Sequence, residues 1–222
     1  MLDNIEIVYK KVKNIKITLS KDGGIIVTAP PKYPIKKIHE LVSEKQNWIK
    51  KHQAKLLNNR KYDYASKELV DGDELYFMGN CYTVRNCIST NNLINDYGEE
   101  LIFNLNKSVI DNVDFKQTLL LEFYRDRADV IFNNLVAKYL KITNQDIKSV
   151  SIKKVKTRWG SCNYRTKTIN LNLELVTRDV DAVEYVILHE IAHLTHPNHS
   201  KEFYNYIERY MPNWKARENK LK

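Results

Sequence analysis

The stretch HEIAHLTHPNH, residues 189–199, contains four of the six histidines of this chain and decides how the rest is interpreted. His189 and His193 are four residues apart. Residues at that spacing lie on one face of a helix, so both imidazoles can reach a single ion. Glu190 directly follows the first histidine, where it can hold a water molecule on that ion without being a ligand. This arrangement is typical of zinc hydrolases, which add a third ligand from beyond the helix and use the carboxylate as a general base.

The residues before the motif predict the helix that this geometry needs. The stretch VDAVEYVILHEIAHL, residues 180–194, repeats apolar residues at helical spacing. Asp181 and Glu184 resemble a capping box, so the helix is expected to start near residue 181. Pro197 disfavours helical conformation in the residue before it, so the helix is expected to end at His196. An ordinary amphipathic helix with histidines on its polar face is the alternative, and the motif's spacing favours the metal site.

A third metal ligand is expected from the segment that follows this helix. His196 continues the stripe of the first two histidines, and three imidazoles stacked along one helix cannot surround an ion tetrahedrally. His199 follows a turn and can approach from the side, which favours it over His196. Two later carboxylates, Glu202 and Glu208, are weaker alternatives, because some zinc hydrolases use a downstream carboxylate.

Two strands are expected ahead of the helix. Residues 149–158 and the stretch TINLNL, residues 168–173, alternate in polarity, and residues 163–167 have the composition of a turn. The edge of such a strand can pair with an extended peptide and present one amide to the metal. An ordinary strand that covers the helix fits the pattern equally well. The candidates for substrate binding on this segment are Arg158, Trp159, Asn170 and Asn172.

Three segments around the motif carry a family resemblance: RWGSCN (158–163), INLNLEL (169–175) and EYVILHEIAHLTHPNHSKEFY (184–204). Together they resemble the YgjP-like metallopeptidase domain family, a relative of the SprT-like and WLM zinc peptidases. The pattern extends upstream through NIKITLSKDGGIIVTAPP, EKQNWIKKH and GDELYFMGNCYTV, so it covers essentially the whole chain. The resemblance implies one Zn²⁺ per chain, bound by His189, His193 and His199, with Glu190 as the catalytic base. It gives no role to the RWGSC stretch.

The positive charge of the chain is concentrated near its N-terminus. Residues 1–61 contain 14 Lys and Arg against 5 Asp and Glu, while the other 161 residues carry 22 of each. One interpretation of this asymmetry is that residues 1–61 bind nucleic acid or another polyanion. A lysine-rich solvated surface is the alternative, because Arg60 is the single arginine there and lysine gives little specific recognition.

The composition predicts a cytoplasmic protein that does not insert into a membrane. No apolar run approaches the length of a membrane span, and the N-terminal residues lack the apolar core of a signal peptide. Three cysteines are a low and odd number, so we expect them to be free and reduced. Cys162 as a metal ligand or redox switch is less favoured than Cys162 as a small packed side chain.

The order of expected elements predicts an α+β fold. Residues 1–110 are expected to form an N-terminal α+β region, with a hairpin at 13–28, a helix at 35–57 and a small antiparallel sheet at 69–105. Residues 111–222 are expected to form a zincin-like catalytic domain with a long helix at 115–140, a small sheet, the HExxH helix and a last helix at 201–210. The polar residues 58–68 are the best linker.

Three functions are compatible with these patterns. The first is a zinc metallopeptidase acting on a protein or peptide, in which Glu190 takes a proton from a metal-activated water. The second is a metal-dependent nucleotide pyrophosphohydrolase, which is less favoured because no Gly-rich phosphate loop is present. The third is a nucleic-acid-associated binding module with a structural zinc. Its weakness is that it gives Glu190 no role.

Overall fold

The chain folds into two compact units, and the division falls between Asp63 and Tyr64. The computed structural model describes residues 5–20 and 22–221, without the side chains of residues 57–60. Each unit combines helices and strands, which confirms the expected α+β class. The division lies within the polar stretch 58–68 that the sequence favours as a linker. The boundary expected near residue 110 lies instead inside the second unit, because the sheet before it shares a core with the helix after it.

The first unit packs two helices against a three-stranded sheet. Its elements are β1 (Ile5–Tyr9), β2 (Lys16–Leu19), β3 (Ile25–Ala29), α1 (Ile35–Glu44) and α2 (Gln46–Arg60). The expected hairpin is formed by β2 and β3, and β1, which the sequence did not predict, pairs with β3 in parallel. The single helix expected over 35–57 is divided at Lys45. A small core of five residues holds the unit together: Val27, Ala29, Ile38, Val42 and Ile49.

The second unit begins with a short 3₁₀ helix, η1 (Tyr64–Ser66), and a four-stranded sheet. The strands are β4 (Glu74–Phe77), β5 (Asn80–Ile88), β6 (Leu93–Asp96) and β7 (Glu100–Leu105), in the order β4-β5-β7-β6. The expectation of a purely antiparallel sheet is wrong, because β5 and β7 pair in parallel. After β5 the chain first forms the edge strand β6, and the β6–β7 hairpin then places β7 beside β5.

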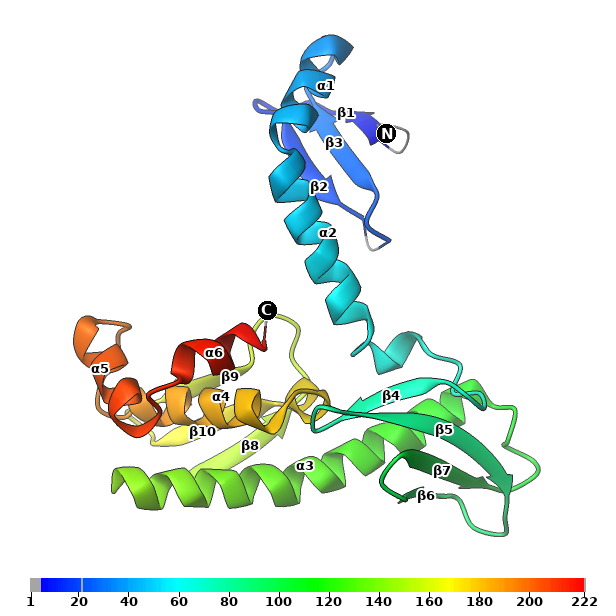
Figure 1. Cartoon of the computed structure of the whole chain (residues 1–222), viewed down its shortest axis with the longest axis vertical. Helices are drawn as coiled ribbons and strands as arrows, with labels where there is room; N and C mark the ends of the chain where they lie inside the picture. The colour runs from blue at the N-terminus through cyan, green and yellow to red at the C-terminus, as the bar shows by residue number, and fades with distance from the viewer. Residues whose placement is uncertain (1–4, 21, 222) are drawn as a thin grey trace. The chain divides into compact units, whose positions relative to one another are not determined.

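The long helix α3 (Val113–Thr143) joins this sheet to the rest of the unit (Figure 1). It starts at Asn112, whose side-chain oxygen accepts a hydrogen bond of 3.0 Å from the backbone N–H of Phe115. It ends at Asn144, which adopts the left-handed conformation common at helix C-termini. Five apolar side chains spaced four residues apart form its buried stripe: Leu120, Tyr124, Ala128, Phe132 and Val136. This stripe supplies a continuous core for both halves of the unit.

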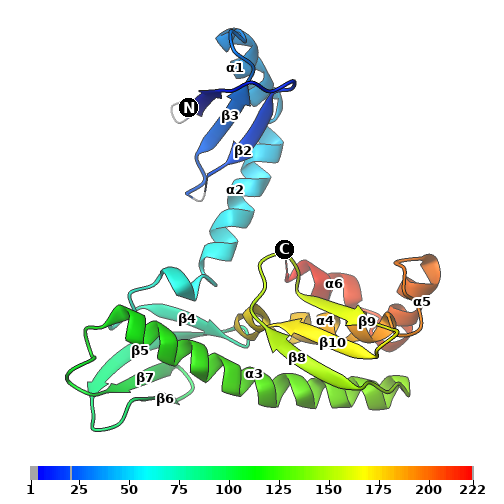
Figure 2. The ribbon, with the colours of Figure 1, turned by 180° about the vertical axis from the view of Figure 1, so that it is seen from behind.

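A second small sheet packs against α3 and against the helix that follows the sheet in the chain, α4 (Val180–Ala192) (Figure 2). Its strands are β8 (Ser149–Lys153), β9 (Gly160–Asn163) and β10 (Thr168–Asn172), in the order β8-β10-β9. The single strand expected over 149–158 is wrong, because the chain leaves the sheet after Lys153 and returns as β9. The side chain of Asn172 holds the connecting loop through its amide group, which donates to the carbonyls of Val155 (2.8 Å) and Arg158 (2.9 Å).

After β10 the chain forms the 3₁₀ helix η2 (Leu173–Thr177) and three helices: α4 (Val180–Ala192), α5 (Lys201–Tyr210) and α6 (Trp214–Asn219). The bounds of α5 are those expected. The helix α4 starts close to the expected residue, but the predicted capping box is absent and the N-cap, Asp179, makes no side-chain cap bond. It ends four residues before His196, because the N–H groups of Leu194 and Thr195 bind carbonyls three residues back and tighten the last turn.

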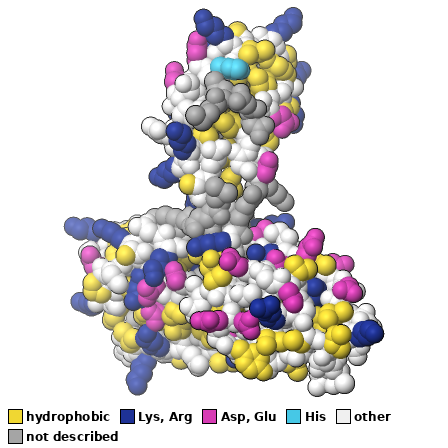
Figure 3. Space-filling model, turned by 45° about the vertical axis from the view of Figure 1, so that its right-hand side comes forward, with side chains coloured by type: hydrophobic (Ala, Val, Ile, Leu, Met, Phe, Trp, Pro, Cys, Tyr) yellow, Lys and Arg dark blue, Asp and Glu magenta, His cyan; other side chains and the backbone are white. Residues whose placement is uncertain are grey.

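Surface charges of both signs are interspersed on the face of the second unit drawn in Figure 3. This agrees with the equal numbers of acidic and basic residues outside residues 1–61. Among the described residues, no helix has the length and apolar character required to cross a lipid bilayer.

A cluster of ion pairs attaches α6 to α4. The carboxylate of Glu184 binds Arg217 on α6 and Lys138 on α3, and Lys220 lies 2.8 Å from Asp181. Burial of Glu184 alone would raise its pKa, but the hydrogen bonds from Lys138 and Arg217 outweigh burial and lower the pKa. Asp181 and Glu184, which the sequence pattern assigned to a capping box, therefore bind residues of α6 and hold that helix against α4.

Replacing Arg217 by alanine is expected to destabilise the second unit. The change leaves the carboxylate of Glu184, which is 8% exposed, with one cationic partner fewer. We expect the free energy of unfolding to fall by about 2 kcal/mol, measured by urea denaturation. Arg209→Ala, which removes an exposed arginine from α5, is the control and should change it by less than about 0.5 kcal/mol. Equal effects of the two substitutions would contradict this role for Arg217.

Candidate metal centre

Three histidines converge at the C-terminal end of α4. His189 lies on the helix, His193 is its C-cap, and His199 lies in the loop before α5. One ring nitrogen from each lies within 4.8 Å of the other two, and Nε2 of His199 is 3.0 Å from Nε2 of His189. The early end of α4 lets the chain turn back, so that His199 approaches the helical pair from the side.

The positions of these nitrogens fit a tetrahedral metal ion. Three imidazole nitrogens about 2.1 Å from one zinc ion lie about 3.4 Å from one another, close to the spacing found here. Imidazole nitrogens suit zinc and several other transition metals. Among the described residues, this trio is the one group of histidine, cysteine or acidic side chains with such a spacing. The donor set therefore fits a metal and leaves a fourth position for water or substrate.

The other expected ligand candidates lie outside the cluster. The ring of His196 packs against Tyr206, with 5.4 Å between the ring centroids. Glu202 and Glu208 are exposed residues of α5, and the pKa of Glu202 is lowered by a hydrogen bond from Ser200. The structure thus brings His199 to the pair on α4 and leaves His196 and both carboxylates apart from it.

Hydrogen bonds orient the imidazoles so that Nε2 points inward. Nδ1 of His193 lies 3.2 Å from the carbonyl of His196, which only accepts, so Nδ1 carries the proton. Nδ1 of His189 lies 3.4 Å from the hydroxyl of Tyr185, and that hydroxyl donates to Glu218 at 3.4 Å. Having used its proton on Glu218, the Tyr185 hydroxyl accepts from Nδ1 of His189. Both rings therefore keep an unprotonated Nε2, the form that binds a metal.

Burial also keeps these rings neutral. It lowers the pKa of His189 to about 3, and the neighbouring imidazoles of His193 and His199 add to this effect. Burial lowers the pKa of His193 as well. The fully buried ring of Phe203 on α5 packs against all three, with centroid distances of 4.9, 4.7 and 4.8 Å to His189, His193 and His199. Phe203 thus forms the apolar base of the histidine cluster.

Glu190 is enclosed between α4 and strand β9. Its side chain is only 5% exposed, and burial raises its pKa to about 7 against the opposing charge of Arg158. It lies directly against Gly160, where an added Cβ would come within 2.6 Å of Oε1 and 2.8 Å of Cγ of Glu190. Side-chain carbons do not approach that closely, so a larger residue at position 160 would displace the side chain of Glu190 from this place.

The RWGSC stretch, to which the sequence assigned no role, surrounds this carboxylate. Gly160 gives Glu190 its space, and Cys162, on the same face of β9, has its pKa raised to about 11 by burial and by the charge of Glu190. Trp159 packs on the core and lies under the guanidinium of Arg178, 4.9 Å from its ring centroid. The glycine within RWGSC, which begins β9, was the signal in the sequence for this close approach.

The four expected substrate-binding residues separate into two groups. Arg158, Asn170 and Asn172 line one pocket on the sheet, and Trp159 does not. Asn172 is 4% exposed, and its oxygen accepts from the backbone N–H of Glu174 while its amide group holds the loop described above. Its side chain therefore acts structurally, which leaves Arg158 and Asn170 as the two with groups free to bind a ligand.

A family model described as the YgjP-like metallopeptidase domain matches residues 13–222 of the chain. The chain belongs to this family. The resemblance drawn from the sequence is thereby confirmed, and membership in a metallopeptidase family implies a bound metal ion, which the histidine cluster fits.

Individual relatives of this YgjP-like protein are shorter. An uncharacterized protein of Methanocaldococcus jannaschii is 30% identical over 101 residues, which cover 44% of this chain and 88% of that protein. Two solved structures are similar to about 40% of the chain. The metallopeptidase zymogen abylysin of Pyrococcus abyssi is 22% identical over 90% of its own length, with a TM-score of 0.38. The metallopeptidase zymogen jannalysin of M. jannaschii is 29% identical over 92% of its length, with a TM-score of 0.37.

Tyr185→Phe is expected to weaken metal binding while the fold is retained. The substitution removes the hydroxyl that orients His189 and keeps the ring that stacks on Trp214, 6.2 Å between centroids. We expect about a tenfold higher dissociation constant for zinc, measured by competition with a chelator. Tyr204→Phe, whose ring also stacks on Trp214 with 5.1 Å between centroids, is the matched control. An unchanged affinity in Tyr185→Phe would show that the hydroxyl does not orient His189.

Proposed function

We propose that this protein is a zinc-dependent peptidase in which His189, His193 and His199 hold the metal and Glu190 is the general base. The observation that carries the proposal is the convergence of three imidazoles beside a buried carboxylate, next to the edge strand β9. A zinc ion held there would supply Lewis acidity, which polarises a carbonyl and lowers the pKa of water toward neutrality.

Glu190 suits the transfer of a proton. A pKa near 7 lets its carboxylate take a proton from the attacking water at neutral pH and later donate it to the leaving amide nitrogen. Its contact with Gly160 restricts its side chain to one place between α4 and β9. A base held in one position acts without first losing conformational freedom, which favours the reaction.

Strand β9 is the element that we propose binds the substrate. It lies at the edge of its sheet, so one row of its backbone N–H and C=O groups has no strand partner among the described residues. An extended peptide that adds to this edge gains main-chain hydrogen bonds. Since Gly160 touches Glu190, a peptide bound there would pass close to the catalytic carboxylate.

The base assignment is tested by Glu190→Gln. We expect normal zinc content, because the three histidines remain, and a loss of peptide hydrolysis of about 10²–10⁴-fold, because glutamine cannot accept the proton. The measurements are metal analysis and cleavage of an unfolded protein substrate. Glu202→Gln, an exposed carboxylate nearby, should keep both properties.

Retained zinc with undiminished hydrolysis by Glu190→Gln would refute the base assignment. Assaying a panel of nucleotides beside the protein substrate distinguishes the peptidase from the alternative function, a nucleotide pyrophosphohydrolase. Pyrophosphate release without peptide cleavage by the wild-type protein would favour a nucleotide hydrolase.

Gly160→Ala is expected to impair turnover without removing the metal. The added methyl group occupies the space of the Glu190 carboxylate, which must move from its position. We expect kcat to fall by about 10²-fold, as for other misplaced catalytic groups, with unchanged zinc content. Cys162→Ala, which removes bulk from the same face of β9, is the control and should stay within about threefold of the wild type. A fully active Gly160→Ala protein would contradict the positioning of Glu190 by this strand.

A further inference from the structure

A pocket of about 160 Å³ lies on the face of the β8-β10-β9 sheet that points away from α4. Ile169 and Leu171 of β10 are buried in the core, so Asn170 between them projects from the opposite face. Ser161 pairs with Asn170 and shares that face. The loop before β9 contributes Arg158, and the end of β8 contributes Lys153.

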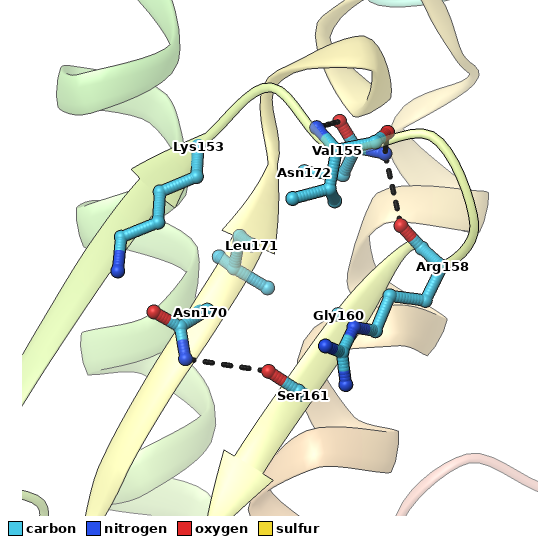
Figure 4. A pocket seen from close by; sticks show the side chains of 8 residues that line it. All are labelled: Lys153, Val155, Arg158, Gly160, Ser161, Asn170, Leu171 and Asn172. Carbon is cyan, nitrogen blue, oxygen red and sulfur yellow. Dashed lines mark hydrogen bonds between the residues drawn. The ribbon is translucent and has the colours of Figure 1, made fainter.

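The groups around this pocket are suited to an anion. Lys153 and Arg158 stand on either side of Asn170 and Ser161 (Figure 4), and no carboxylate is among the lining residues. Within the described part of the chain neither cation forms an ion pair, whereas the adjacent Lys154 pairs with Glu174 at 3.4 Å. Two unpaired cations in one pocket attract a carboxylate or a similar anion.

Ser161 adds a neutral donor between the two cations. Its oxygen accepts a hydrogen bond of 3.3 Å from Nδ2 of Asn170. The hydroxyl proton of Ser161 is therefore available to a ligand. The pocket thus offers a lysine ammonium, an arginine fork and a hydroxyl, and a single carboxylate can accept from all three kinds of donor.

The pocket is next to the proposed catalytic edge. Gly160 lines it through its backbone and on its other side touches Glu190. In a peptide added to β9, successive side chains point to opposite faces of the sheet. The peptide residue opposite Ser161 therefore points to the pocket face, and its two neighbours point to the face of Glu190.

We propose that this pocket is a substrate subsite that selects a carboxylate on the peptide residue next to the one that faces Glu190. The proposal rests on the peptidase function proposed above. An acidic side chain within an extended peptide and the carboxylate at a peptide C-terminus share the required chemistry. The subsite thus makes acidic peptides the preferred substrate class.

Binding to the inactive protein tests the subsite without catalysis. Zinc-loaded Glu190→Gln protein is titrated with labelled short peptides that differ in one residue, glutamate or glutamine, placed at each position in turn. We expect the best glutamate peptide to bind about tenfold more tightly than its glutamine partner, and this preference should weaken with added salt. A second pair, with a free or an amidated C-terminus, distinguishes the two sources of the carboxylate.

Further substitutions in the Glu190→Gln protein identify the residues responsible for the preference for glutamate peptides. Lys153→Gln is expected to reduce the glutamate preference to about threefold, and Lys153→Gln with Arg158→Gln to abolish it. Lys156→Gln removes an exposed lysine of the same loop that does not line the pocket, so it should leave the preference unchanged. Equal binding of all matched peptides, or equal effects of Lys153→Gln and Lys156→Gln, would overturn the subsite.

Cleavage by the wild-type protein separates this proposal from the function on which it rests. Cleavage that is indifferent to glutamate and glutamine at every position keeps the peptidase and overturns the subsite. Selective binding that Lys153→Gln weakens, without cleavage of any peptide, supports the subsite and overturns the peptidase. Cleavage at a bond beside the preferred glutamate supports both.

Discussion

The close contact between Glu190 and the backbone of Gly160 connects the helix that carries the histidines to the strand that borders the site. It requires a glycine in β9, a carboxylate one residue after the first histidine of α4, and a sheet packed closely on that helix. Burial in this contact raises the pKa of Glu190 to about 7, and the charge of Arg158, in the loop before the strand, opposes the rise. One packing interaction therefore sets both the position of the proposed base and its affinity for a proton.

The other sides of α4 are held by elements that follow it in the chain. Phe203 of α5 packs under all three imidazoles, and Glu218 of α6 reaches His189 through the hydroxyl of Tyr185. Ion pairs of Arg217 and Lys220 attach α6 to the start of α4. Strand β9, Phe203 on α5 and helix α6 thus support the histidine cluster from three sides. This support gives the three histidines a defined geometry.

Local patterns predicted the elements near the site well and some of their relations poorly. The long helix and α5 were evident from apolar spacing, and the strand at 168–172 from its alternation. The division of residues 149–163 into β8 and β9 was not evident from the sequence, because it depends on hydrogen bonds from Asn172 to the loop between these strands. Asp181 and Glu184 matched a capping pattern, yet long-range partners on α3 and α6 bind them instead.

The sequence by itself determined the family, the α+β class and the chemical identity of the candidate metal ligands, since ligand spacing on a helix is a local property. Only the tertiary structure decided that His199 joins the pair on α4, because the turn after the helix sets the direction of the returning chain. It also decided the purpose of Gly160, and it gathered Lys153, Arg158 and Ser161 around one pocket. Those relations depend on the pairing of β8, β9 and β10, and pairing between distant segments has no local signal in the sequence.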